Sequence, residues 1–225
     1  MQTFSNPNVH KPSFRLSLAL WFSLACGISP ATNAANLSFQ ALDKNGAAMA
    51  DVVIYATPVG MALPPANRTD TAIISQSDMQ FSPYVTAVQT GSQVRFPNYD
   101  KMEHHVKSFS AAKEFEIKTY ERGVVPPPVL FDKPGIVIVY CLLHNWMRAY
   151  VLVLDTPYFI KTDQLGTANL DRLPNGTYEI KAWHPTMGSI KPPLTQTIKV
   201  SDQSPPIKWQ FDFVPVPRKT KAVSN

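Results

Sequence analysis

The stretch YCLLHNWMRAYVLVL, residues 140–154, places metal-binding side chains beside a strongly apolar run. Cys141, His144 and Met147 follow one another at intervals of three, and the run AYVLVL comes directly after Arg148. A continuous apolar run of this length is typical of a buried β-strand. The residues before the cysteine, IVIVY, have the same character. The sequence therefore predicts a strand that ends at Cys141, a loop that carries His144 and Met147, and a second strand.

The same strand-like character extends over the rest of the chain. From residue 36 onward, apolar residues alternate with polar ones or are β-branched, Pro and Gly separate the segments, and no helical period is convincing. Residues 70–155 predict an antiparallel β-sandwich of about seven or eight short strands. We also expect a turn at Asn45-Gly46 and a hairpin turn at Asn175-Gly176. The predicted fold class is all β.

The N-terminal segment has the features of a secretory signal peptide. Residues 1–34 contain two basic residues and no acidic residue, then an apolar run at residues 16–28 and the small-residue stretch ATNA. We therefore expect cleavage after Ala34 and export to the periplasm. The apolar run is too short to cross a bilayer comfortably and no later stretch is long enough, so no membrane span is predicted.

The charge of the mature chain is mild. Cleavage would remove two of the 21 Lys and Arg residues and none of the 16 Asp and Glu residues, which leaves a net charge of +3. This charge supports no nucleic-acid partner. We expect the C-terminal residues 216–225, which include the basic stretch PRKTK, to form a disordered tail.

The cysteine count makes residue 141 unusual. The sequence has two cysteines, and Cys26 lies within the predicted signal peptide. A lone Cys141 in an oxidising compartment is buried and inert, paired with another chain, or bound to something. A thiolate, two imidazoles and a weak thioether are what a trigonal copper site needs, and these soft donors favour copper over calcium or magnesium. The segment FPNYDKMEHHVKSF, residues 96–109, supplies further histidines at a distance along the chain.

The two segments FPNYDKMEHHV and YCLLHNWM resemble the copper-binding segments of the cupredoxins, with the short Cys-x2-His-x2-Met loop of the amicyanins. Similar sequences also occur among exported proteins labelled methylamine utilization protein. The resemblance covers about residues 70–155 and implies a Greek-key β-sandwich that holds one type 1 copper ion. Carried over by position, it implies four copper ligands, which are His104, Cys141, His144 and Met147.

Two neighbouring histidines compete for one ligand position. The resemblance favours His104, because the family's ligand lies six residues after an asparagine, here Asn98. His105 stays open as the alternative. Asn98 matches the family residue that pins the ligand loops by hydrogen bonds, and Trp146 lies inside the loop, where we expect it to contribute to a docking face.

The resemblance implies one-electron transfer between Cu(I) and Cu(II) in the periplasm. We expect no enzymatic activity, because the four histidines after residue 34 leave none for the second copper centre that copper oxidases and nitrite reductases need. The resemblance also implies a redox partner protein such as an amine dehydrogenase or a cytochrome c. Two alternative functions belong to other classes. In the first, the protein would be a copper carrier or sensor that passes no electrons. In the second, it would be a scaffold module in which the copper domain is structural.

The outer segments share a second resemblance. Residues 36–66 and 156–215 resemble the first and second halves of a prealbumin-like or carboxypeptidase-regulatory-like β-sandwich. We therefore predict one discontinuous domain with the cupredoxin domain inserted between its strands. The alternative is a tandem arrangement of separate pieces, each of which would be marginal alone.

Overall fold

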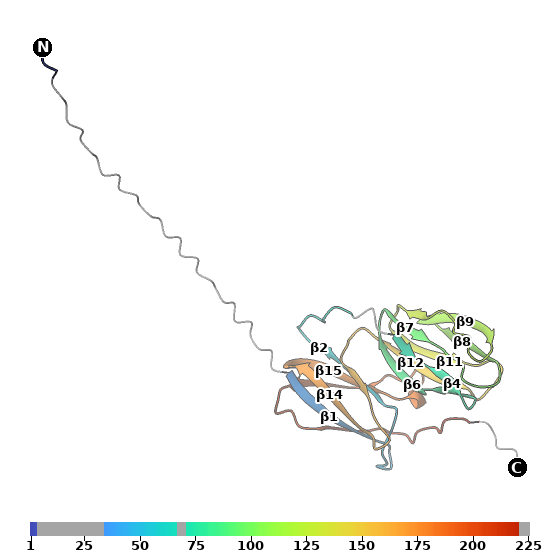
Figure 1. Ribbon diagram of the computed structural model, residues 1–225. Helices are drawn as coiled ribbons and strands as arrows, with labels where there is room; N and C mark the ends of the chain where they lie inside the picture. Colours follow the sequence, from blue (N-terminus) through green and yellow to red (C-terminus); the bar gives the residue numbers. More distant parts are fainter. Residues whose placement is uncertain (4–33, 67–70, 221–225) are drawn as a thin grey trace. The chain divides into compact units, whose positions relative to one another are not determined.

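The computed structural model describes residues 1–3, 34–66 and 71–220 (Figure 1). Residues 4–33, which hold most of the predicted signal peptide, lie outside this part, as do residues 221–225. The described chain consists of β-strands and one short 3₁₀ helix, η1 (Pro185–Met187), so the all-β prediction is confirmed. Within the same residues, no helix has the length and apolar character needed to cross a membrane.

The strands beside the predicted ligand loop form a five-stranded sheet. Its order is β6 (Val85–Gln89), β12 (Arg148–Leu154), β11 (Gly135–Tyr140), β8 (His104–Ser110) and β9 (Lys113–Tyr120). Strands β11 and β12, which lie side by side in Figure 1, are antiparallel, as the sequence predicts. Strand β6 instead pairs parallel with β12. The prediction of a wholly antiparallel sandwich is therefore wrong at this pair.

A smaller sheet and a hairpin complete this half of the chain. They consist of β10 (Val129–Phe131), β7 (Ser92–Arg95) and β3 (Thr71–Ile73) in one sheet, and β4 (Ser75–Ser77) with β5 (Gln80–Ser82) in the hairpin. Residues 71–154 thus contain ten strands rather than seven or eight, because four of them have only three residues each. Side chains from both sheets and from the hairpin form one hydrophobic core.

The flanking segments build two further sheets. One has the order β14 (Thr167–Pro174), β1 (Ala34–Leu42) and β17 (Ile207–Gln210). The other has the order β13 (Phe159–Lys161), β2 (Val53–Pro58), β15 (Gly176–Trp183) and β16 (Leu194–Val200). Strands from before and after residues 71–154 therefore pair directly with one another. This pairing supports the discontinuous domain, which we retain as a proposal.

The predicted hairpin at Asn175-Gly176 is wrong. Strand β14 ends at Pro174 and β15 begins at Gly176, but the two strands lie in different sheets. The turn before Gly46 is present, since Asp43 accepts hydrogen bonds from the N–H groups of Asn45 and Ala47 and Gly46 has a φ of 84°. After this turn the chain pairs back on the end of β1, with Leu42 opposite Ala48 in an antiparallel bridge, and β2 then joins the other sheet.

Strand β12 buries both of its faces. Ala149, Val151 and Val153 belong to the core that also contains Cys141 and Met147. The alternate residues, Tyr150, Leu152 and Leu154, belong to the core of the outer sheets. Burying one side chain of this size contributes about 1.5–3 kcal/mol. This double burial explains why the sequence there is a continuous apolar run, and it ties the ligand loop to both cores.

The first residues of the C-terminal segment contact the rest of the chain. The Val216 N–H donates to Thr186 Oγ1 at 2.9 Å. The Arg218 guanidinium donates to the Phe81 carbonyl and lies 4.9 Å from the centroid of the Tyr84 ring. Cation–π contact and a charge-assisted hydrogen bond together fix this segment.

His184 caps η1 from a buried position. Its Nδ1 accepts a hydrogen bond from the Thr186 N–H at 3.1 Å. Burial lowers the pKa of His184 to about 4, against the opposing charge of Asp51. Protonation is therefore costly in the folded chain, both because the imidazole is desolvated and because the charged ring loses its acceptor.

We expect the protein to lose stability between about pH 6.5 and about pH 4. Below about pH 6.5 the unfolded chain binds a proton at His184, whereas the folded chain binds it only below about pH 4. The free energy of unfolding therefore falls by an amount on the order of 3 kcal/mol over this range. Urea unfolding at several pH values measures it. The control His184→Asn keeps a capping acceptor that does not titrate, and an equal slope in both proteins would contradict the assignment.

Candidate metal centre

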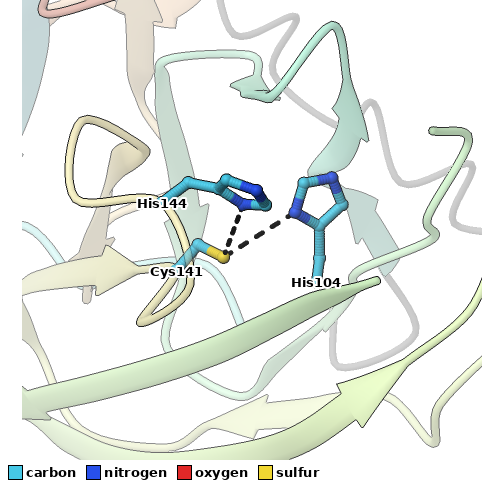
Figure 2. A group of neighbouring side chains, drawn as sticks. All are labelled: His104, Cys141 and His144. Atoms are coloured by element: carbon cyan, nitrogen blue, oxygen red, sulfur yellow. Dashed lines mark hydrogen bonds between the residues drawn. The ribbon is translucent and has the colours of Figure 1, made fainter. Parts of the chain in front are cut away.

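Three of the four predicted ligands converge in the structure. His104 is the first residue of β8, Cys141 follows β11 directly, and His144 lies in the loop before β12. Their donor atoms all lie within 4.8 Å of one another, and no fourth His, Cys, Asp or Glu of the described chain joins the group. Figure 2 shows both imidazoles turned toward the cysteine sulfur. The sequence segments 37 residues apart thus meet at one point.

The distances between donors fit a bound metal ion. Cys141 Sγ lies 3.7 Å from His104 Nδ1 and 3.5 Å from His144 Nδ1. A metal with a sulfur ligand at about 2.3 Å and nitrogen ligands at about 2.0 Å, at angles of about 110–120°, separates sulfur from nitrogen by about 3.5–3.7 Å. One thiolate and two imidazoles are also the equatorial donors of a trigonal copper site. The residues present therefore fit copper.

Strand pairing closes the ligand loop at its base. The β11–β12 ladder ends with Tyr140 opposite Arg148. Beyond it, the Cys141 N–H donates to the Met147 carbonyl at 3.2 Å, and the Met147 N–H donates to the His144 carbonyl at 2.9 Å. Met147 is 1% exposed and shares a core with Cys141. The loop thus brings Met147 beside the cysteine backbone, and its role as axial ligand stays a prediction.

A carboxylate lies behind His104. The Asp100 Oδ2 atom is 2.7 Å from His104 Nε2, on the side of the ring opposite the nitrogen that faces Cys141. A proton held at Nε2 by this contact leaves Nδ1 available as a ligand. Burial raises the pKa of Asp100, but hydrogen bonds from His104 and from the N–H groups of Met79 and Asp78 outweigh burial and lower it.

His105 points to another neighbour. Its Nε2 lies 2.9 Å from Glu116 Oε1 on strand β9. The pairing of β8 with β9 shifts its register between His104 and Val106, and the contacts of the rings separate the two histidines: His104 lies against Cys141, whereas His105 lies against Glu116. The geometry favours His104 over His105, as the position of Asn98 in the sequence predicts.

The sulfur lies in a setting that favours its charged form. Cys141 is 2% exposed, and burial raises the pKa of its thiol. The hydrogen-bonding contact with the His104 ring and hydrogen bonds from backbone N–H groups, including those of His105 and Leu143, outweigh burial and lower the pKa below its ordinary value. A thiolate is the form that binds metals.

Trp146 packs on His144. The two ring centroids are 5.4 Å apart, and the Trp146 indole N–H donates to the Met79 carbonyl at 3.1 Å. Trp146 is only partly exposed, whereas Leu142 and Leu143 are 55% and 51% exposed beside it. The contribution of Trp146 to a docking face stays a prediction.

Sequence reasoning missed Asp100 and Met79. A carboxylate four residues before a candidate ligand is a signal that could have singled out Asp100. Met79 gave no signal, because it takes part through its backbone N–H and carbonyl groups. Any residue except proline carries both groups.

Comparison with known proteins finds similarity among solved structures. No family profile and no curated protein matches the chain. A purple cupredoxin from Nitrosopumilus maritimus is 22% identical and covers 36% of this chain and 98% of its own, with a TM-score of 0.33. Amicyanin from Paracoccus versutus is 18% identical and covers 44% of this chain and 97% of its own, with a TM-score of 0.34.

A third similar structure belongs to an enzyme. The copper-containing nitrite reductase from Thermus scotoductus SA-01 is 22% identical and covers 43% of this chain but 25% of its own, with a TM-score of 0.35. All three similarities extend over less than half of this chain. The solved structures that resemble the chain therefore include cupredoxins, the family that its two ligand segments resemble.

The two adjacent histidines can be separated by matched substitutions. We expect His104→Gln to weaken Cu(II) binding by more than about 100-fold, the upper end of what removing an outer partner of a ligand costs. His105→Gln should change the affinity little, because residue 105 faces Glu116. Competition with a calibrated chelator measures both affinities, and the opposite order would make His105 the ligand.

Asn98 should be essential to the segment that carries His104. Its buried side-chain amide donates to the carbonyls of Met102 and Tyr120, and its Oδ1 accepts from the Asp100 N–H. We expect Asn98→Ala to lower the free energy of unfolding of the metal-free protein by about 2–3 kcal/mol, because several buried groups lose their partners. Denaturant titration tests this, and a change below about 0.5 kcal/mol would contradict it.

Proposed function

We propose that the protein transfers single electrons through one type 1 copper ion. His104, Cys141 and His144 would hold the ion, and Met147 would be the weak axial ligand. The observation that carries the proposal is the convergence of one sulfur and two ring nitrogens at distances of 3.5 and 3.7 Å. A His₂Cys set with a weak thioether is the donor set of blue-copper electron-transfer centres.

Bound there, copper would supply one-electron chemistry by cycling between Cu(I) and Cu(II). The chain's own residues would keep the donors in place. The backbone hydrogen bond from the Cys141 N–H to the Met147 carbonyl fixes Cys141, and the contact with Asp100 fixes the orientation of the His104 ring. Ligands held in this way move little when the charge of the site changes, which keeps the cost of reorganisation low.

The donor segments are anchored in well-packed structure. Strand β12 is buried on both faces, and Val106 of β8 is fully buried two residues after His104. Packed interiors resist small displacements of backbone and side chains. This rigidity favours electron transfer over a carrier that must open to release its metal.

The remaining parts of the proposal concern the setting of the protein. We propose a periplasmic location, from the features of residues 1–34, and an electron carrier without enzymatic activity. The redox partner would be another protein, such as an amine dehydrogenase or a cytochrome c. Electrons would pass near His144, which follows the exposed residues Leu142 and Leu143 in the ligand loop.

Spectroscopy of the copper-loaded protein tests the proposal. We expect an intense visible thiolate-to-copper band and a narrow hyperfine splitting in the electron paramagnetic resonance spectrum. Reduction with ascorbate should abolish both signals, and reoxidation should restore them. Cys141→Ser should remove the band. Met147→Leu should keep the band but change the reduction potential, because the axial ligand tunes it.

Other outcomes would favour the rival functions. A weak tetragonal Cu(II) signal that Cys141→Ser leaves unchanged would show that the thiolate is no ligand. Ready release of Cu(I) to an acceptor, with slow electron exchange, would indicate a carrier or sensor. Partner binding that survives copper loss in Cys141→Ser would indicate a scaffold.

A further inference from the structure

The β4–β5 hairpin turns at Asp78 and Met79, and both residues have left-handed backbone conformations. Their φ angles are 54° and 52°, and Ser77 pairs with Gln80 across the turn. Two-residue hairpin turns with positive φ at both positions usually contain Asn-Gly or Asp-Gly. A methionine in this conformation is rare, because its Cβ crowds the backbone. Such residues persist where their surroundings hold them, and they cluster at functional sites.

The backbone of this turn holds the carboxylate behind His104. The N–H groups of Asp78 and Met79 donate to the two oxygens of Asp100, at 2.7 and 2.9 Å. One of these oxygens lies 2.7 Å from His104 Nε2. Hydrogen bonds to a carboxylate are short and strong. The turn therefore sets the position of Asp100, and Asp100 sets the orientation of the His104 ring.

The same turn also reaches the other histidine. The Met79 carbonyl accepts the indole N–H of Trp146 at 3.1 Å, and the Trp146 ring lies 5.4 Å from the ring of His144. The Met79 side chain packs against the core that contains Cys141. A single peptide segment thus contacts His104 through Asp100 and His144 through Trp146.

Both strands of the hairpin are anchored outside the turn. On β4, the Gln76 N–H donates to the Pro97 carbonyl at 2.9 Å, which ties the strand to the segment that carries Asp100. On β5, the Phe81 carbonyl accepts a hydrogen bond from Arg218, and Gln80 Nε2 lies 3.4 Å from the Lys219 carbonyl. These contacts resist displacement of the turn as a unit.

We propose that the Asp78-Met79 turn is a shared brace that positions both histidines, so that a disturbance at one ring is transmitted to the other. The proposal rests on the proposed function only for the role of His104 and His144 as copper ligands. The turn residues act through Asp100 and Trp146, which makes them positioning residues. The centroids of the two rings lie 4.9 Å apart, at an interplanar angle of 64°.

A matched pair of turn variants tests the brace. In the first variant a glycine is inserted between Asp78 and Met79, which changes the length of the turn and displaces its N–H and carbonyl groups. The control, Asp78→Gly, places a glycine in the same turn and removes an exposed side chain, but it keeps the length of the turn and its backbone groups. Nuclear magnetic resonance of the metal-free protein measures the nitrogen chemical shifts of each imidazole, which report the surroundings of the ring. The variants His104→Gln and His144→Gln assign the signals.

We expect the insertion to move the signals of both rings and the control to leave them near their wild-type positions. After copper loading, the insertion should raise the rate of Cu(II) release by about 10-fold, the lower end of the effect of outer-shell partners. In a folded insertion variant, movement of only one ring or of neither would overturn the proposal.

A second variant decides the question if the insertion prevents folding. Trp146→Phe keeps an aromatic ring beside His144 and removes the N–H that donates to Met79. We expect it to move the His104 signals as well as those of His144. Its control is Trp183→Phe, which removes an indole N–H that donates to the Gly188 carbonyl. Movement of the His144 signals alone would overturn the brace.

The two proposals can fail separately. The ring signals are measured in metal-free protein, so they test the brace independently of copper. A wild-type protein without a type 1 copper spectrum would refute the proposed function, and the ring signals of the turn variants would still test the brace. A wild-type protein with a type 1 spectrum but independent ring signals would refute the brace alone.

Discussion

The pairing of β11 with β12 and the burial of β12 on both faces fix the position of the ligand loop. A slip of one residue would exchange the side chains of β12 between the two cores, so the register is strongly specified. Because Tyr140 then lies opposite Arg148, the chain between them must return within a short loop. Cys141 and Met147 stand at the two ends of that loop.

The second donor segment reaches the same point from a neighbouring strand. Strand β8 lies beside β11, with Lys107 opposite Tyr140, which places His104 at the end of the sheet where the ligand loop emerges. Asn98 and Asp100 organise the residues before β8 through hydrogen bonds. The donors are therefore held by backbone pairing and buried polar contacts, which is the arrangement that a rigid redox site requires.

Turn dipeptides were less informative than strand patterns. The alternation at Tyr178, Ile180 and Ala182 predicts a half-buried strand, and these three side chains are buried in β15. The Asn175-Gly176 dipeptide predicts a hairpin, but the strands on either side of it join different sheets. Alternation depends on which face of a strand is buried, whereas the partner of a strand depends on distant segments that no local pattern describes.

The all-β class, the strand positions around the ligand loop and the candidate donors could be predicted from the amino-acid sequence, because side-chain chemistry and apolar period are local properties. Which strands pair, the parallel pairing of β6 with β12, and the direction in which His104 and His105 face became known from the fold. It also revealed the contacts of Asp100 and of the Asp78-Met79 turn. The turn takes part in these contacts through backbone N–H groups, which every residue except proline carries, so the approach of distant segments identifies the turn and its residue types do not.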